Sequence, residues 1–264
     1  MRPTFNVLRL ATLTAVAAVT MGTAARASTI TLNFDSVATG PTQAPGIWYT
    51  DRYAPAGFQT AFFDGDNRLK HSISAADGNN FRPLPFTGTF YNTQGRKYDL
   101  PPGIHYQAID LYVPADWATT GRRMAGLWGV ARDTADVIAR YPILEFTSES
   151  ATPRFRGWNN GTWLDLGLPT GFTYDTWYTL EVTLNPNGSF TYVVGDVSAT
   201  TAASASAYIG EVILQGHNTD EGVTYDIYWD NYRGRSGAEP IPLPSAAIAG
   251  LTLLGGLGLT RIRR

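Results

Sequence analysis

The chain of 264 residues contains no cysteine, which excludes disulfides, catalytic thiols and cysteine-based metal sites. Charged residues make up only 16% of it and the formal net charge is −2, so it has no basic character suited to nucleic acid. It also lacks the G-x-S-x-G turn of serine hydrolases and the glycine-rich loops that hold phosphate. These absences favour a protein that works through packing and surface contacts, with no nucleic-acid partner.

What the sequence does contain is aromatic and turn-forming residues. It has 7 Trp, 14 Tyr, 12 Phe, 27 Gly and 16 Pro, and 44% of its residues are hydrophobic. This composition can bury a core, and its glycines and prolines suit a protein with many tight turns. The length suggests one large or two small domains, and all-β sandwiches often take 200 or more residues as a single unit.

The first 27 residues have the pattern of a secretory signal peptide. Arg2 and Arg9 give a basic start, and the apolar stretch rich in small residues runs from Leu10 to Met21. Ala25-Arg26-Ala27 then forms an A-x-A cleavage site. The alternative is a buried N-terminal helix. We therefore predict export and divide the chain into a signal peptide (1–27), a folded body (28–234) and a C-terminal segment (235–264).

The C-terminal segment begins with a polar, proline-rich stretch and continues as an apolar run from residue 246 to 260. That run is at the short limit for crossing a bilayer. Arginines end the chain and would stay on the cytoplasmic side. They are Arg261, Arg263 and Arg264.

A short proline motif, an apolar helix and a terminal arginine cluster together resemble the PEP-CTERM sorting signal. The motif reads Glu239-Pro240-Ile241-Pro242-Leu243-Pro244 and is nearer to the Pro-Leu-Pro variants than to Val-Pro-Glu-Pro. The resemblance implies a Gram-negative type of envelope, cleavage by an exosortase, and association with extracellular polysaccharide. A permanent membrane anchor is the alternative, so the membrane insertion is either transient or lasting.

Between the two ends, period-2 segments separated by turn residues predict β-strands, with no long amphipathic helix. Regularly spaced short strands favour a sandwich or barrel. The predicted strands cover residues 29–34, 104–113, 124–131, 141–146, 154–158, 177–184, 189–194, 208–214 and 223–232.

The clearest hairpin joins 177–184 to 189–194 through Asn185-Pro186-Asn187-Gly188, and its first strand alternates apolar with polar residues. The stretch 173–196, TYDTWYTLEVTLNPNGSFTYVVGD, resembles a late strand pair of concanavalin A-like and laminin G-like jelly rolls. The closing segment VTYDIYWDNY (223–232) is similar to their last strand. The resemblance implies an antiparallel β-sandwich, a fold that hosts lectins, glycanases and structural modules alike.

The spacing of the Asp and Glu residues does not favour a catalytic role. The strand triplet Glu-x-Asp-x-x-Glu of related glycanases is absent, and the pair Glu145 and Glu149 would lie ~13 Å apart in an extended strand. That is too far for a retaining pair, so solvated charges at a loop edge are expected there. Asp226 and Asp230 have the same spacing. The histidines His71, His105 and His217 form no metal motif.

Sugar binding has one local candidate, because sugar rings stack on aromatic side chains and their hydroxyls bind polar ones. The segment 154–163 supplies Arg156, Trp158, Asn159 and Trp163 around a turn. In the alternative, the two tryptophans fill the sandwich core. A second loop, Asp64-Gly65-Asp66-Asn67, is read as a turn between strands.

A structural Ca²⁺ that joins the first strand to the last is a further hypothesis, since such clips occur in carbohydrate-binding jelly rolls. Asp35 ends the first predicted strand and Asp230 lies in the last, and both offer hard oxygen ligands. In the alternative, both carboxylates are solvated.

Together these patterns predict an exported cell-surface β-sandwich whose most favoured role is non-catalytic contact with extracellular polysaccharide. A structural or adhesive surface protein is the second hypothesis, and a divergent polysaccharide hydrolase or lyase is the third.

Overall fold

The computed structural model describes residues 28–77, 93–118, 122–217 and 223–237. Within these ranges the chain forms β-strands and three short 3₁₀ turns, η1 (Ala75–Asp77), η3 (Ala115–Ala118) and η4 (Glu149–Ala151). No helix in the described part is long and apolar enough to cross a membrane. The predicted signal peptide and the sorting motif with its apolar segment lie outside the described residues.

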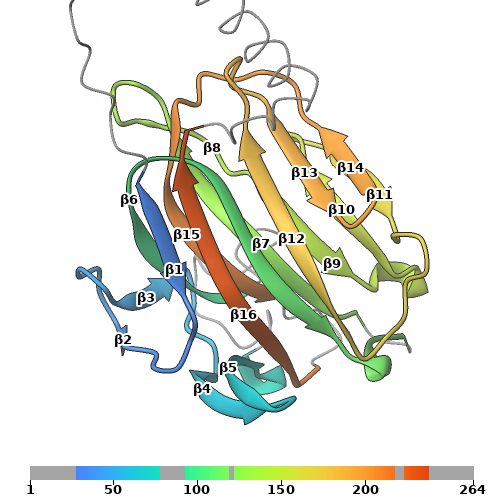
Figure 1. The fold of residues 1–264 in the computed structure, drawn as a ribbon. Helices are drawn as coiled ribbons and strands as arrows, with labels where there is room; N and C mark the ends of the chain where they lie inside the picture. Colours follow the sequence, from blue (N-terminus) through green and yellow to red (C-terminus); the bar gives the residue numbers. More distant parts are fainter. Residues whose placement is uncertain (1–27, 78–92, 119–121, 218–222, 238–264) are drawn as a thin grey trace, which may run out of the picture.

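The strands form two layers with the core between them, and Figure 1 shows β12, β13 and β14 in front of β7, β9 and β10. The first sheet contains β3 (Trp48–Asp51), the first half of β6 (Thr93–Val113), β15 (Tyr208–His217), β7 (Met124–Arg132), β9 (Ile143–Thr147), β10 (Arg154–Trp158) and β11 (Trp163–Gly167). The second sheet contains β4 (Gly57–Phe63), β5 (Asp66–Ile73), β16 (Tyr225–Ser236), the second half of β6, β12 (Thr176–Leu184), β13 (Phe190–Val194) and β14 (Val197–Thr200). The remaining strands are β1 (Thr29–Leu32), which pairs with β16, β2 (Thr39–Gly40), which pairs with β3, and β8 (Ile138–Arg140), which pairs with β7.

Strand β6 belongs to both layers. Its first half pairs with β15 and β3, and its second half pairs with β12 and β16. Between the halves, Pro101, Pro102 and Gly103 form a corner at which the register against β15 shifts. Proline is tolerated at such a bulge because no ladder hydrogen bond is required there, and Gly103 adopts a φ of 77°.

The predicted antiparallel β-sandwich of jelly-roll type is therefore confirmed. The described pairings are antiparallel, except for the short β2–β3 bridge. Large apolar side chains from both sheets meet between the layers, with Phe155 of β10 against Tyr178 of β12 at 5.7 Å between ring centroids. Strand β16 continues to Ser236, past the predicted boundary of the body at residue 234.

The two turns singled out in the sequence are present. Strands β12 and β13 form the expected hairpin, in which Leu180, Val182 and Leu184 are buried on one face. Of the Asn-Gly pair, only Gly188 has a positive φ, 77°, as in hairpins that close with a glycine bulge. Strands β4 and β5 meet at Asp64 and Gly65, both with positive φ, which is a tight hairpin turn.

Candidate functional site

The outer face of the first sheet, which points away from the core, carries a second apolar cluster. Its buried members are Met124, Trp128 and Val130 of β7, Ile143 of β9 and Ile213 of β15. Three partly exposed rings pack onto it, from Tyr141, Trp158 and Trp163. Because side chains alternate along a strand, these residues share one face while their chain neighbours enter the core.

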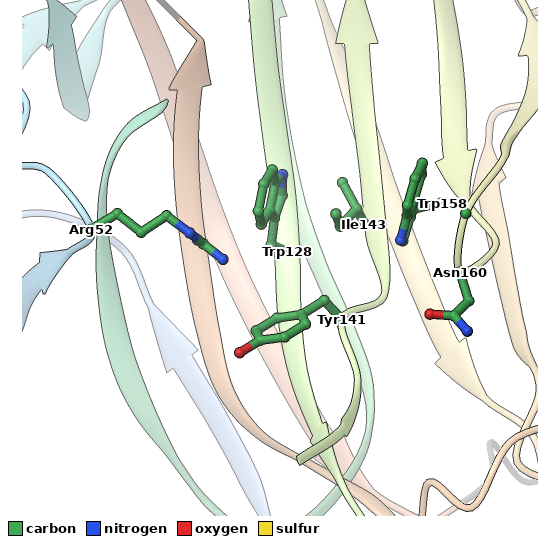
Figure 2. A pocket seen from close by; sticks show the side chains of 7 residues that line it. Arg52, Trp128, Tyr141, Ile143, Trp158 and Asn160 are labelled. Atoms are coloured by element: carbon green, nitrogen blue, oxygen red, sulfur yellow. The ribbon is translucent and has the colours of Figure 1, made fainter. Parts of the chain in front are cut away.

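The rings of Trp128, Tyr141 and Trp158 line a cavity of about 510 Å³, here named the aromatic pocket. Figure 2 shows Trp128, Ile143 and Trp158 side by side on neighbouring strands, with Arg52 on one side and Asn160 on the other. The guanidinium of Arg52 lies 5.3 Å from the ring centroid of Trp128 and 5.8 Å from that of Tyr141. The full lining is Arg52, Trp128, Tyr141, Ile143, Trp158, Asn160 and Gly161.

A smaller cavity of about 160 Å³, here named the polar pocket, adjoins the first, because Trp128 and Trp158 line both. The two pockets are together named the groove. The polar pocket is lined by Thr93, Arg122, Met124, Trp128, Glu145, Glu149, Arg156, Trp158, Trp163 and His217.

An ion-pair network is the centre of the polar pocket. Arg156 is only 3% exposed, and its Nε donates to Glu145 at 2.7 Å while one terminal nitrogen donates to Glu149 at 2.6 Å. Its guanidinium also covers the ring of Trp163 at 3.9 Å. Arg122 and Arg154 approach Glu149 at 3.4 and 3.6 Å. Buried ion pairs of this kind fix side-chain positions, because each charge needs its partner.

The expectation that Glu145 and Glu149 are solvated charges at a loop edge is wrong for Glu145, whereas Glu149 lies in a turn and is partly exposed. Glu145 is 1% exposed and points outward from β9, and the chain leaves the extended conformation after Thr147. The turn η4 brings Glu149 back to the same guanidinium that holds Glu145. Both carboxylates are therefore much closer than the ~13 Å of an extended chain.

Burial and arginine neighbours shift the two carboxyl groups in opposite directions. Burial raises the pKa of Glu145 above its usual value, against the opposing effect of Arg156. Burial acts the same way on Glu149, but the three surrounding arginines together outweigh it and lower the pKa of that carboxyl. The groove thus holds one carboxyl group that retains its proton more readily and one that loses it more readily.

Two buried polar atoms of this pocket have no hydrogen-bond partner among the described residues. They are Oε2 of Glu145, a residue that is 1% exposed, and the indole Nε1 of Trp128, which is 3% exposed. Buried polar atoms are rarely left unpaired, so such atoms in a cavity wall indicate a position for a ligand or solvent group.

The predicted binding residues separate into two groups. Arg156, Trp158 and Trp163 lie together on the outer face, with the two indole centroids 4.9 Å apart, so the alternative that both tryptophans fill the sandwich core is wrong. Asn159 does not line either pocket. Its side chain accepts from the backbone of Ala202 at 3.1 Å and so anchors the turn, while the next residue, Asn160, lines the aromatic pocket.

The sequence patterns did not predict that Trp128, Tyr141, Arg52 and His217 line the groove. The strand that carries Trp128 reads MAGLWGVAR and is buried on both faces almost throughout, so no alternation marks its outer side. No second histidine lies near His217 in the sequence, so no local motif marks it. Its strand, β15, lies beside β7 with Gly216 opposite Ala125, and His217 and Met124 line the same pocket.

The residues proposed for calcium do not fit a clip. The carboxylate of Asp230 is paired with the guanidinium of Arg68, and that of exposed Asp35 accepts a hydrogen bond from Asn33. In the described part of the chain, no group of three or more His, Cys, Asp or Glu side chains could hold a metal ion. Calcium needs six to eight oxygen ligands, and a cation already neutralises Asp230.

No protein-family model matches the sequence, and no curated protein matches it. Solved structures resemble the fold at low identity. A β-glucanase from Bacillus licheniformis is 12% identical, with a TM-score of 0.47, over 80% of this chain and 98% of its own. A GlcNAcα1-4Gal-releasing endo-β-galactosidase from Clostridium perfringens is 12% identical, with a TM-score of 0.48, over 78% of this chain and 61% of its own. An alginate lyase from a Chlorella virus is 13% identical, with a TM-score of 0.43, over 72% and 93%. With TM-scores below 0.5, these likenesses carry no weight for the site.

Proposed function

We propose that this protein binds a polysaccharide in the groove on the outer face of the first sheet. The observation that carries the proposal is the arrangement of Trp128, Tyr141 and Trp158 around a cavity of about 510 Å³ that adjoins a polar pocket. Apolar ring faces of sugars stack on such aromatic surfaces, and a few fixed polar groups give orientation.

Affinity electrophoresis through gels that contain soluble polysaccharides tests the proposal. We expect the full-length chain to be retarded by at least one polymer and the variant Trp158→Ala to migrate freely. Trp177→Ala is the matched control, because Trp177 is a partly exposed tryptophan of the second sheet. Free migration of the wild type in every gel would contradict the proposal.

Polysaccharide cleavage is the second candidate function, and one observation favours it. Glu145 and Glu149 line the same pocket and their pKa values are shifted apart, which is the pattern of an acid and base pair. We rank it second because both carboxylates are bound to Arg156, and Glu145 is almost fully buried. We expect no reducing sugar from β-glucans, agarose or chitin. Turnover that disappears in Glu149→Gln would reverse this ranking.

We further propose that this chain is exported to the cell surface, where the groove binds polysaccharide outside the cytoplasm. In this proposal the C-terminal segment is cleaved from the mature protein. The support is the composition of residues 1–27 and 235–264 described above. Intact-mass analysis of the mature protein tests it. We expect both ends to be missing, whereas a retained peptide with Gly258 and Leu259 would indicate a permanent anchor.

A further inference from the structure

The two unpartnered atoms of the polar pocket differ in chemistry. Glu145 uses Oε1 for Arg156, at 2.7 Å, and its Oε2 remains an acceptor without a donor. The Nε1 of Trp128 is a donor without an acceptor. Both side chains line the same pocket and both are more than nine-tenths buried. The pocket therefore offers one acceptor and one donor to whatever enters it.

Gly126 lies beside both of these side chains. It lies directly across from Glu145 in the pairing of β7 with β9, two residues before Trp128. A Cβ added at Gly126 would lie 2.5 Å from the Nε1 of Trp128 and 3.4 Å from the Cβ of Glu145. The indole N–H of Trp128 thus lies over Gly126, close to the Cβ of Glu145. A residue with a side chain at position 126 would prevent the indole from lying there.

We infer that this point of the groove binds a single hydroxyl group of a neutral sugar. This inference rests on the proposed function and deepens it. A hydroxyl has one donor hydrogen for Glu145 Oε2 and lone pairs that accept from Trp128 Nε1. It makes the same two hydrogen bonds that a water molecule would, so replacing solvent here sacrifices neither of them.

Charge excludes an acidic ligand at this point. A carboxylate or sulfate group could accept from Trp128, but its negative charge would face the free oxygen of Glu145 in a site shielded from water. The arginines nearby do not reverse this, because each is already paired with a carboxylate. Arg156 binds both glutamates, and Arg154 lies 3.6 Å from Glu149 and 3.9 Å from Asp165. Arg122 lies 3.4 Å from Glu149, and Arg52 of the aromatic pocket lies 2.5 Å from Asp51. The ligand class is therefore a neutral glycan rather than a polyuronate or sulfated polymer.

Binding measurements with the full-length chain test this inference. The probes are two neutral polymers, barley mixed-linkage β-glucan and xylan, and two acidic ones, alginate and polygalacturonate. We expect binding to a neutral polymer and none to the acidic ones. For Glu145→Gln and for Trp128→Phe we expect affinity for that polymer to fall at least about tenfold, as for loss of a hydrogen bond to a charged group.

The two variants should also be coupled, because they act on one hydroxyl. The double variant Glu145→Gln with Trp128→Phe should bind about as weakly as the weaker single variant. Additive losses, or wild-type affinity in both single variants, would overturn the single-hydroxyl assignment. Trp128→Phe leaves the Arg156 ion pairs in place, so it decides the question even if Glu145→Gln does not fold.

The matched control is Trp117→Phe, which removes another buried indole N–H without a described partner, but in the core between the sheets. It should leave affinity unchanged, and an equal loss there would mean that the effect is general and the inference wrong. Binding of wild type to the acidic polymers alone would overturn the inference and leave the proposed function standing. Binding to no polymer would overturn both.

Discussion

Aromatic rings cover the outer faces of both sheets, yet the two faces differ in the hydrogen bonding of one tryptophan on each, Trp177 and Trp128. On the second sheet, Phe63 stacks on Tyr228 at 3.7 Å, and Tyr112 meets Trp177 at 5.4 Å. The indole N–H of Trp177 donates to Asp64 at 2.7 Å, whereas the corresponding N–H of Trp128 on the first sheet has no described partner. Rings alone do not distinguish a binding site from a stable surface. What the first sheet adds is an unpaired indole N–H in the wall of a cavity.

Ion pairs show the same contrast between the faces. Arg68 of the second sheet pairs with Asp230, and this pair lines neither the aromatic nor the polar pocket. Arg156 of the first sheet holds two carboxylates that line the groove. Changes at Arg156 should therefore alter stability and binding together, and changes at Arg68 should alter stability alone.

The largest expected effect is that of Arg156→Ala. It leaves Glu145 buried without its partner, which should lower the free energy of unfolding by about 3 kcal/mol and abolish polysaccharide binding. Urea unfolding and affinity electrophoresis measure the two effects. Arg68→Ala also leaves a buried carboxylate, Asp230, and should destabilise without changing affinity.

The double variant Arg156→Met with Glu145→Gln separates the two roles of this pair. It removes both charges, so most of the lost stability should return while binding stays lost. Recovery of binding in this variant, or loss of binding in Arg68→Ala, would break the contrast between the faces.

A smaller effect on stability and binding is expected when a glycine on the outer face of each sheet is replaced by alanine. Gly126→Ala would bring a Cβ within 2.5 Å of the Trp128 indole, so the indole must move. We expect about 1–2 kcal/mol of destabilisation and weaker binding. Gly57→Ala of the second sheet meets only the Gln59 and Ser72 side chains, at 3.0 Å or more, and should stay within about 0.5 kcal/mol of wild type with full affinity. Thermal melting and the same binding assay compare the two.

The smallest expected effect is on the stability of the protein at acidic pH. The pKa of Glu149 is lowered in the folded protein below its ordinary value, because the arginines outweigh burial. A carboxyl group with a depressed pKa contributes stability above pH 4.5 that is lost as the pH falls through the folded value. Urea midpoints measured from pH 6 to pH 3 should therefore fall more in the wild type than in Glu149→Gln. Parallel curves for the two proteins would argue against an ion-pair role for Glu149.

Most of the second half of the fold could be predicted from local patterns. Strand β10 has its predicted bounds, and the predicted hairpin of β12 and β13 has its predicted buried face. In the first half, the turn between β4 and β5 was predicted without the bounds of these strands, and β3 and the first part of β6 were not predicted. The predicted strand begins at residue 104, whereas β6 begins at Thr93 and passes through a corner at Pro101 and Pro102 into the other sheet. No local pattern distinguishes a corner from an end, because the difference lies in the partner strands.

By itself, the sequence determined the antiparallel sandwich, the hairpin turns and the presence of a polar and aromatic segment at 154–163, because alternation and turn chemistry act between near neighbours. Only the tertiary structure decided that Trp158 and Trp163 face outward, and that Glu145, Glu149 and Arg156 meet. It also placed Trp128 among them. These outcomes depend on which strands lie side by side and which face the second sheet covers, and long-range pairing decides both.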